Sequence, residues 1–281
     1  MPELPEVETM CRGIAAVVGQ AIHSVRFPKT HLCDIEMLPS KRVIRRRVEG
    51  QSVRGVRRVA KRVVIDLDSG DSVVFEPRMT GRVLLTEPPD RDHIRAVFEF
   101  ADADHPALIF WSMRGLSTLH VYSRDQLAEV VGPERVGPDA LQVTAEHLRE
   151  RLKGSRRAVK VALLDQKVVA GIGNIYASEV LHRARVHPET LCERVSKRAW
   201  QRIRAETVIV LEEAIRAKGS TLRDGNYRTA SDEPGGFQEM HRVYGREGLK
   251  CLGCRRGTIR RTVQAQRSTY FCPVCQRKAR T

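Results

Sequence analysis

The chain opens with the stretch MPELPEVE, residues 1–8, from which the rest of the sequence is best interpreted. The small side chain at position 2 predicts removal of Met1, which leaves Pro2 as the N-terminus. An α-amino group has a pKa of about 7.7–8.0, against about 10.4 for lysine, so more of it is neutral and nucleophilic at pH 7. A secondary amine such as Pro2 adds to an aldehyde carbon as an iminium cation, which is an electron sink for eliminations. Glu3 is close enough to exchange protons at the same carbon.

The same stretch also reads as an ordinary helix start. Pro5 suits a first helical turn, and acidic side chains are favoured there by the helix dipole. Apolar residues then recur at helical spacing from Val7 to Val18, and Gly19 is a plausible end. Residues 1–8 alone do not decide between the two interpretations.

Composition points to a polyanionic partner. The 281 residues include 49 lysines and arginines against 34 acidic residues, a formal charge of +15. This balance favours nucleic acid, although a basic soluble protein with no nucleic-acid role has the same composition. The length predicts two or more domains. The sequence contains no apolar run of 18 residues and no signal-peptide pattern, so we expect a soluble protein that stays where it is made.

Four of the seven cysteines have the spacing of a metal site. Cys251, Cys254, Cys272 and Cys275 form two C-x2-C pairs separated by 17 residues. Four thiolates complete a zinc tetrahedron and leave no open position, so the predicted metal is structural. Two disulfides are the alternative, which the lack of a signal peptide does not support. Between the pairs, residues 258–263 and 267–271 predict two strands, hence an arginine-rich zinc β-hairpin.

The first half of the chain predicts strands and the second half predicts helices. Short β-rich runs recur from about residue 21 to 123, which is typical of a sandwich or barrel. Two Gly-Pro pairs in 131–139 mark a linker. Beyond it, the glycine turn GIGN at 171–174 runs into a helix, and a long helix follows from Ser196 to about Lys218. A helix start behind a glycine turn suits a DNA phosphate. Residues 221–236 predict a polar, glycine-rich loop that is a candidate for mobility.

These pieces stand in one order: PELPE at the N-terminus, an all-β half, GIGNIYASE at 171–179 and a four-cysteine hairpin containing QRSTYFC at 266–272. In this combination the chain resembles the bacterial formamidopyrimidine-DNA glycosylase / endonuclease VIII family over essentially its whole length, and PELPE resembles the first branch more. The resemblance implies a multidomain α+β fold: a helix and β-sandwich in 1–131, a linker in 132–140, a helical helix-two-turn-helix domain in 141–237 and a zinc module in 238–281.

The resemblance implies a bifunctional DNA glycosylase and abasic-site lyase. Pro2 would attack C1′ of the damaged nucleotide and Glu3 would protonate the sugar oxygen. Lys61 matches a lysine that contacts phosphate and is assigned a role in β-elimination. Arg267 and Asn174 match a pair that grips phosphates at the lesion. The substrates implied are formamidopyrimidines, with 8-oxoguanine left open.

Further DNA contacts follow from the same resemblance. Met79 matches a methionine that wedges into the stack when the damaged base leaves it. The other DNA-binding candidates are Arg91, Arg114, Arg156 and Lys160. The partner is double-stranded DNA with damaged bases or abasic sites, the cofactor is one structural Zn²⁺, and we expect a monomer in the bacterial cytoplasm, associated with the nucleoid.

Two segments depart from the family pattern. Glu76 stands where the family has a histidine that meets phosphate, and it would repel phosphate unless Arg78 takes over. In the segment that carries Arg114, we place Gly115 where the family has phenylalanine, so opposite-base preference and 8-oxoguanine specificity are in doubt. Three alternatives stay open: a catalytically weak or inactive lesion-binding or architectural protein, a glycosylase of endonuclease VIII type for oxidised pyrimidines, and a zinc-ribbon transcription factor.

Overall fold

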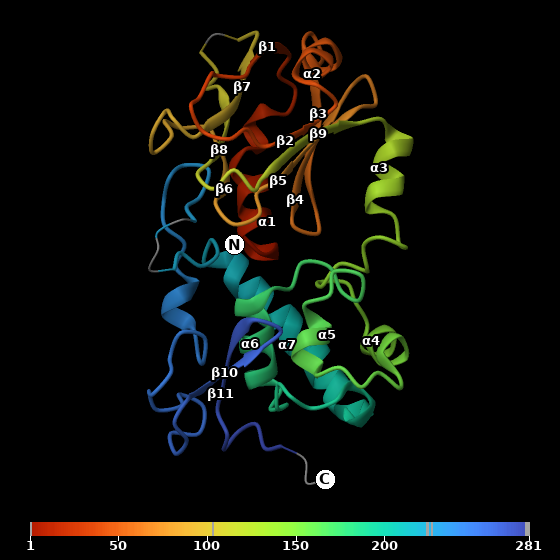
Figure 1. Ribbon diagram of the computed structural model, residues 1–281, viewed down its shortest axis with the longest axis vertical. Helices are drawn as coiled ribbons and strands as arrows, with labels where there is room; N and C mark the ends of the chain where they lie inside the picture. The colour runs from red at the N-terminus through yellow and green to blue at the C-terminus, as the bar shows by residue number, and fades with distance from the viewer. Residues whose placement is uncertain (1, 103, 223–224, 226, 279–281) are drawn as a thin grey trace. The chain divides into compact units, whose positions relative to one another are not determined.

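The computed structural model describes residues 2–102, 104–222, 225 and 227–278 (Figure 1). The chain forms two compact units. The first contains Met1–Gly132 and Ile215–Gln238, and the second contains Pro133–Ala214 and Glu239–Thr281. None of the helices in the described part of the chain has the length and apolarity that crossing a lipid bilayer requires.

The first unit is the predicted β-sandwich. One sheet has the order β1 (Ile22–Arg26), β7 (Ile94–Phe100), β8 (Leu108–Ser112), β6 (Gly81–Leu84). The other has the order β2 (Glu36–Leu38), β9 (Thr118–Tyr122), β5 (Ser72–Glu76), β4 (Arg62–Leu67), β3 (Val53–Val59). Neighbouring strands are antiparallel except β2 and β9, which are parallel.

The core of the sandwich is aromatic between the sheets and aliphatic beneath the first helix. Phe75 of β5 meets Phe98 and Phe110 of the other sheet edge-on, with ring centroids 5.7 and 4.9 Å apart. Helix α1 (Leu4–Gly13) and the 3₁₀ turn η1 (Ala15–Val17) bury the predicted apolar stripe, including Val7 and Met10, in the same cluster. Apolar burial of this kind is the main force that fixes α1 to the sheets.

Two helices in this unit escaped sequence analysis. Helix α2 (Lys41–Val48) buries only Ile44 and Val48, and five of its eight residues are cationic. Helix α3 (Arg124–Val131) packs Leu127 on the outer face of the five-stranded sheet. Both are short and mostly polar, so their periodicity is too weak to stand out among neighbouring strands.

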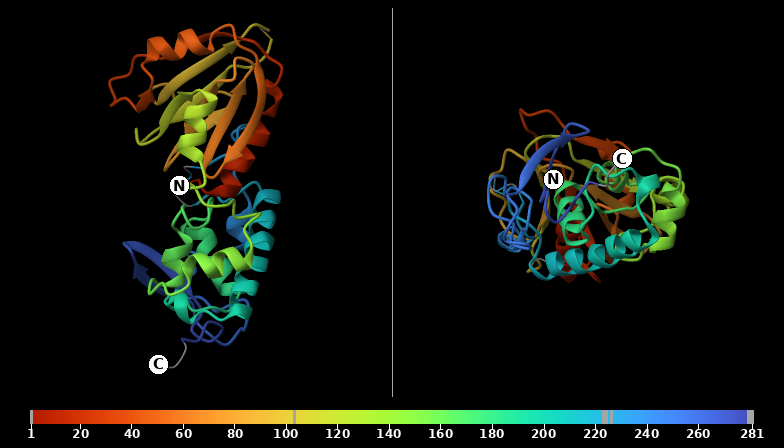
Figure 2. Two further views of the ribbon diagram at one scale, coloured as in Figure 1. Left: turned by 90° about the vertical axis from the view of Figure 1, so that its right-hand side faces the viewer. Right: turned by 90° about the horizontal axis from the view of Figure 1, so that it is seen from below.

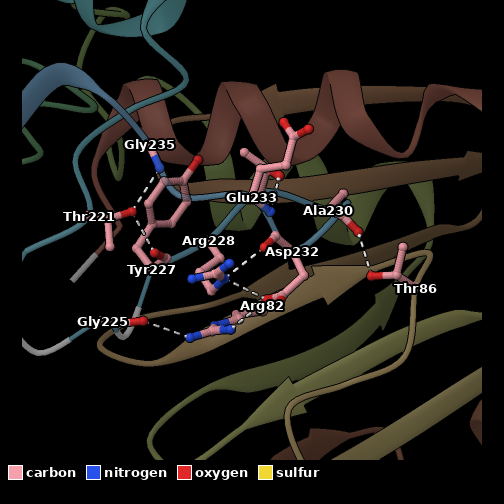
Figure 3. A network of polar contacts seen from close by, with 11 residues as sticks. Arg82, Thr86, Thr221, Gly225, Tyr227, Arg228, Ala230, Asp232, Glu233 and Gly235 are labelled. Atoms are coloured by element: carbon pink, nitrogen blue, oxygen red, sulfur yellow. Dashed lines mark hydrogen bonds and ion pairs between the residues drawn. The ribbon is translucent and has the colours of Figure 1, made fainter.

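Residues 215–238 return to the first unit, although sequence analysis places them in the helical domain 141–237. Tyr227 and Ala230 are buried in the sandwich core. Figure 3 shows Arg82 of β6 donating to the carbonyl of Gly225 at 2.9 Å and pairing with Asp232 at 3.3 Å. The described part of the predicted loop is therefore anchored by specific bonds. Positions 223, 224 and 226 of that loop lie outside the described residues.

The second unit consists of helices and the hairpin. Its elements are α4 (Ala145–Leu152), α5 (Val159–Leu163), α6 (Asn174–Arg183), η2 (Cys192–Arg194), most of α7 (Lys197–Arg216), η3 (Phe237–Met240, which begins in the first unit), β10 (Arg260–Gln264) and β11 (Arg267–Phe271). The β10–β11 hairpin projects from the helices (Figure 2). Helix α6 starts directly behind the glycine turn, as the sequence predicts.

Candidate active site and nucleic-acid interface

Pro2 and Glu3 lie buried at the N-terminal end of α1, and Glu3 is the N-cap of that helix. The carboxylate of Glu6 accepts from the backbone N–H of Glu3 and, through its other oxygen, from that of Ser220, both at 2.8 Å. Glu6 therefore fixes the helix start against the segment 215–238. The predicted removal of Met1 concerns a residue outside the described part.

Lys61 occupies the two-residue turn between β3 and β4, rather than a strand. Arg58 ties this turn to α1, because it pairs with Glu8 at 3.1 Å and donates to the carbonyl of Ala60 at 3.0 Å. Ala60 has φ of 55°, a left-handed conformation that is uncommon outside glycine. The hairpin turn that carries Lys61 is thus bonded to the helix that carries Pro2 and Glu3.

Two loops of the sandwich hold the predicted wedge. Arg114 donates its backbone N–H to Thr80 Oγ1 at 3.0 Å and its Nη1 to Met79 Sδ at 3.4 Å. Ser117 Oγ donates to the carbonyl of Pro77 at 2.8 Å, which also joins the loops. Met79 and Arg114 are therefore neighbours, as a shared role requires.

The second of these loops has apolar side chains that sequence analysis overlooked. Gly115, with φ of 64°, offers no side chain, but Leu116 is 50% exposed and Met113 is 44% exposed. Met79 itself is 40% exposed. Three exposed large apolar groups on two bonded loops are unusual for a soluble surface and indicate a binding function. A signal was present in the sequence, since Met113 and Leu116 lie in a polar turn between two strands.

Glu76 is compensated by two arginines. Arg62 and Arg78 approach its carboxylate at 3.3 and 3.5 Å. The expected repulsion of phosphate is therefore offset locally, and Arg78 is the group that sequence analysis named for this purpose.

The second unit brings Asn174 and the start of β11 together. Asn174, the first residue of α6, donates its Nδ2 to the carbonyl of Ser268 at 2.9 Å. Arg267 precedes Ser268 and is exposed. It follows a two-residue turn in which Ala265 and Gln266 both have positive φ, 46° and 59°, as a type I′ turn requires. Asn174 and the strand that carries Arg267 thus form one bonded structure.

Lys160 has a different place from the expected DNA contact. It is 0% exposed. Its Nζ donates to Asn174 Oδ1 at 2.5 Å, to Thr269 Oγ1 at 2.9 Å and to the carbonyl of Ser268 at 3.4 Å. With Oδ1 held by Lys160, the amide of Asn174 has one fixed orientation. Lys160 therefore positions the phosphate-binding candidates and is not itself on the surface.

We predict that Lys160→Met destabilises the protein by about 2–4 kcal/mol, because three buried acceptors lose their shared donor. DNA affinity should fall with it, since the Asn174 amide is no longer oriented. Urea unfolding and DNA titration measure the two effects. The exposed Lys167 provides the control, because Lys167→Met should change stability by less than about 0.5 kcal/mol. Equal effects of the two substitutions would contradict this role.

Arg91 and Arg156 are exposed in loops, in the first and second unit respectively. Arg91 lies between β6 and β7, and Arg156 lies between α4 and α5. Within the described part of the chain, neither is bonded to the groups described above, so they stay predictions based on charge.

The four cysteines predicted to bind zinc come together. Their sulfurs all lie within 4.8 Å of one another, with Cys251 and Cys275 3.7 Å apart and Cys254 and Cys272 3.8 Å apart. Tetrahedral zinc with bonds of about 2.3 Å needs sulfurs roughly 3.8 Å apart, so the geometry fits one ion. Backbone N–H groups of Gly257 and Arg256 lower the pKa of Cys254 to about 6, which favours the thiolate that zinc binds. His182 Nε2 lies 3.3 Å from Cys251 Sγ and orients this ligand.

Comparison with known proteins agrees with this arrangement. Family profiles match three successive parts of the chain: the formamidopyrimidine-DNA glycosylase N-terminal domain at residues 1–119, the formamidopyrimidine-DNA glycosylase H2TH domain at 132–226, and the zinc finger found in FPG and IleRS at 248–277. Together they place the protein among the zinc-containing DNA-repair glycosylases.

Individual relatives narrow the class. The formamidopyrimidine-DNA glycosylase of Bacillus subtilis (strain 168) is 37% identical over 284 residues, which cover 99% of this chain and 100% of the relative. That of Cereibacter sphaeroides (strain ATCC 17029 / ATH 2.4.9) is 39% identical over 298 residues, with the same coverage. The chain belongs to the formamidopyrimidine-DNA glycosylase family.

Solved structures resemble the whole chain. The MutM (FPG) protein from Thermus thermophilus has a TM-score of 0.85 and 35% identity, covering 99% of this chain and 100% of the other. Lactococcus lactis Fpg in complex with DNA that contains an abasic site has a TM-score of 0.86 and 29% identity, covering 98% and 100%. The predicted fold class, zinc site and enzyme class are thereby confirmed.

Proposed function

We propose that this protein excises oxidised bases from double-stranded DNA and then cuts the strand at the abasic site. The amine of Pro2 attacks C1′ while Glu3 protonates the sugar oxygen, so the glycosidic bond breaks and an iminium forms. Loss of a proton at C2′ releases the 3′ phosphate in β-elimination, and a second elimination releases the 5′ phosphate. The observation that carries the proposal is the bonding of the Lys61 turn to α1 through Arg58 and Glu8, within the unit that holds Pro2 and Glu3.

The second unit supplies phosphate binding in this proposal. Asn174 and Arg267 hold the DNA backbone, and Lys160 keeps the asparagine oriented. Lactococcus lactis Fpg has been crystallised with abasic-site DNA and with Fapy-dG DNA, which supports duplex DNA as the partner here. The protein acts as a monomer in the bacterial cytoplasm, where it associates with the nucleoid through DNA.

A panel of duplexes with one lesion each tests this function. The panel contains a formamidopyrimidine, 8-oxoguanine, an oxidised pyrimidine and a pre-formed abasic site, each opposite every base. We expect excision of formamidopyrimidine and cleavage of the abasic site on both sides. Binding to all lesions without excision or cleavage would point instead to an inactive lesion-binding protein. Excision of the oxidised pyrimidine alone would point to endonuclease VIII-type specificity.

We predict that Met79→Ala slows base excision by about tenfold or more, roughly 1.4 kcal/mol, with little effect on a pre-formed abasic site. The wedge stabilises the extruded base, and an abasic site has no base to extrude. Single-turnover rates on the two substrates measure the difference. Val263→Ala is the control, because this 64% exposed apolar residue lies outside both loops. Equal losses on the two substrates would contradict a wedge.

The exposed Leu116 changes the expectation for the opposite base. Sequence analysis assigns the vacated space only to Met79 and Arg114 and predicts weak discrimination. We propose that Leu116 also enters it, so Leu116→Gly should reduce the ratio of excision opposite cytosine to excision opposite adenine. An unchanged ratio in this variant would leave the task to Met79 and Arg114.

A further inference from the structure

A second basic region lies behind the zinc site. A cavity of about 840 Å³ opens between the C-terminal end of α6, helix α7 and the two cysteine pairs, all within the second unit. Among the described residues that line it, Glu206 is the one acidic group, against five arginines: Arg183, Arg185, Arg242, Arg256 and Arg277.

Most of this positive charge is uncompensated. Arg183 pairs with Glu213 at 2.5 Å. Arg185, Arg242, Arg256 and Arg277 are exposed, and none of them forms an ion pair with another residue in the described ranges. A zinc ion bound by four thiolates has a net negative charge, and Cys254 and Cys275 line the cavity. That charge offsets part of the field of the arginines and leaves an excess.

The cavity is separate from the phosphate-binding candidates of the second unit. Asn174 starts α6, whereas His182, Arg183 and Arg185 of the cavity lie at or beyond its end. The 10 residues of this helix span about 15 Å. Likewise, Arg267 begins β11 and Cys275 follows its end. A phosphate held by Asn174 therefore cannot also occupy the cavity.

Local structure explains only some of these arginines. Arg183 lies in the last turn of α6, where the helix dipole favours cations. Arg185 has φ of 57°, a position that usually takes glycine or asparagine after a helix. An arginine there carries backbone strain without a structural benefit visible in its contacts. Arg242, Arg256 and Arg277 come from the zinc module and have no helix end to stabilise.

We infer that this cavity binds phosphate groups, either of a free oligophosphate or of a DNA strand other than the one held at the lesion. Guanidinium groups match phosphate oxygens in planar, bidentate geometry, and the volume suits a ligand with several phosphates. The inference goes beyond the proposed repair activity and does not depend on it.

Binding of inorganic tripolyphosphate to the zinc-loaded full chain tests the inference. The protein is first saturated with a short duplex that carries a stable abasic-site analogue, so that the lesion-binding groups are occupied. We expect tripolyphosphate to bind this complex, and the triple variant Arg185→Gln, Arg242→Gln, Arg277→Gln to bind it at least about tenfold more weakly. The matched control is Arg151→Gln, Arg194→Gln, Arg198→Gln, which removes three exposed arginines of the same unit outside the cavity and should bind as the unchanged protein does.

A second fluorescent duplex in place of tripolyphosphate distinguishes the two sources of phosphate. A second duplex that binds and is lost only in the cavity variant identifies DNA, and binding of tripolyphosphate alone identifies a free ligand. Zinc content, measured in every variant, shows that the module is intact. Equal losses in the cavity and control variants, or no binding of either probe to the unchanged protein, would overturn the inference. If the first duplex does not bind at all, the proposed function fails, and tripolyphosphate titration of the free protein still tests the cavity.

Discussion

Borohydride should trap no covalent complex between abasic-site DNA and a chain that retains one extra residue before Pro2. Reduction captures the iminium, and an acylated proline nitrogen cannot form one. The free N-terminal amine of the processed chain is the nucleophile in our proposal, so blocking it removes the reaction and not only its efficiency. We expect trapping and strand cleavage to fall on the order of 10³-fold or more.

Two controls separate chemistry from folding. The blocked chain should still contain zinc and bind a duplex with an abasic-site analogue, because those properties belong to the second unit. Lys61→Gln should still be trapped, since in our proposal Lys61 assists elimination and does not form the adduct. Full trapping of the blocked chain would exclude Pro2 and direct attention to lysines, with Lys61 first.

Loss of one zinc ligand should have an effect of similar size on DNA binding. Cys254→Ser is expected to release the metal, unfold the β10–β11 hairpin and abolish specific binding. The hairpin core is small, consisting mainly of Val243, Ile259 and the cysteines themselves, so little else holds it together. Structural zinc contributes about 10–16 kcal/mol of binding free energy in isolated zinc-finger peptides, far more than such a core supplies.

Metal analysis and amide hydrogen exchange of β10 and β11 measure this loss. Cys33→Ser is the matched control, because Cys33 is an exposed thiol in the first unit and should leave one zinc per chain. Retention of zinc in Cys254→Ser, or unchanged protein without metal and with its four thiols oxidised in pairs, would contradict the structural role.

Sequence predicted those features that depend on residue type at fixed spacing. The zinc ligands, the glycine turn before α6 and the strands of the sandwich all have local patterns that carry their own physical cause. The buried position of Lys160 has no such pattern, because it depends on Asn174 and Thr269, which are distant in sequence. Leu116 was overlooked for a related reason: exposure of an apolar side chain is a property of the folded loop.

The interleaving of the chain between the two units has a consequence for cutting it. A proteolytic nick at the exposed Gly154, between α4 and α5, would give two fragments, neither of which contains a complete unit. The N-terminal fragment would lack Tyr227 and Ala230 of its sandwich core, and the C-terminal fragment would lack α4. Each fragment would therefore need the other in two separate places, so the nicked protein should stay associated by fragment complementation.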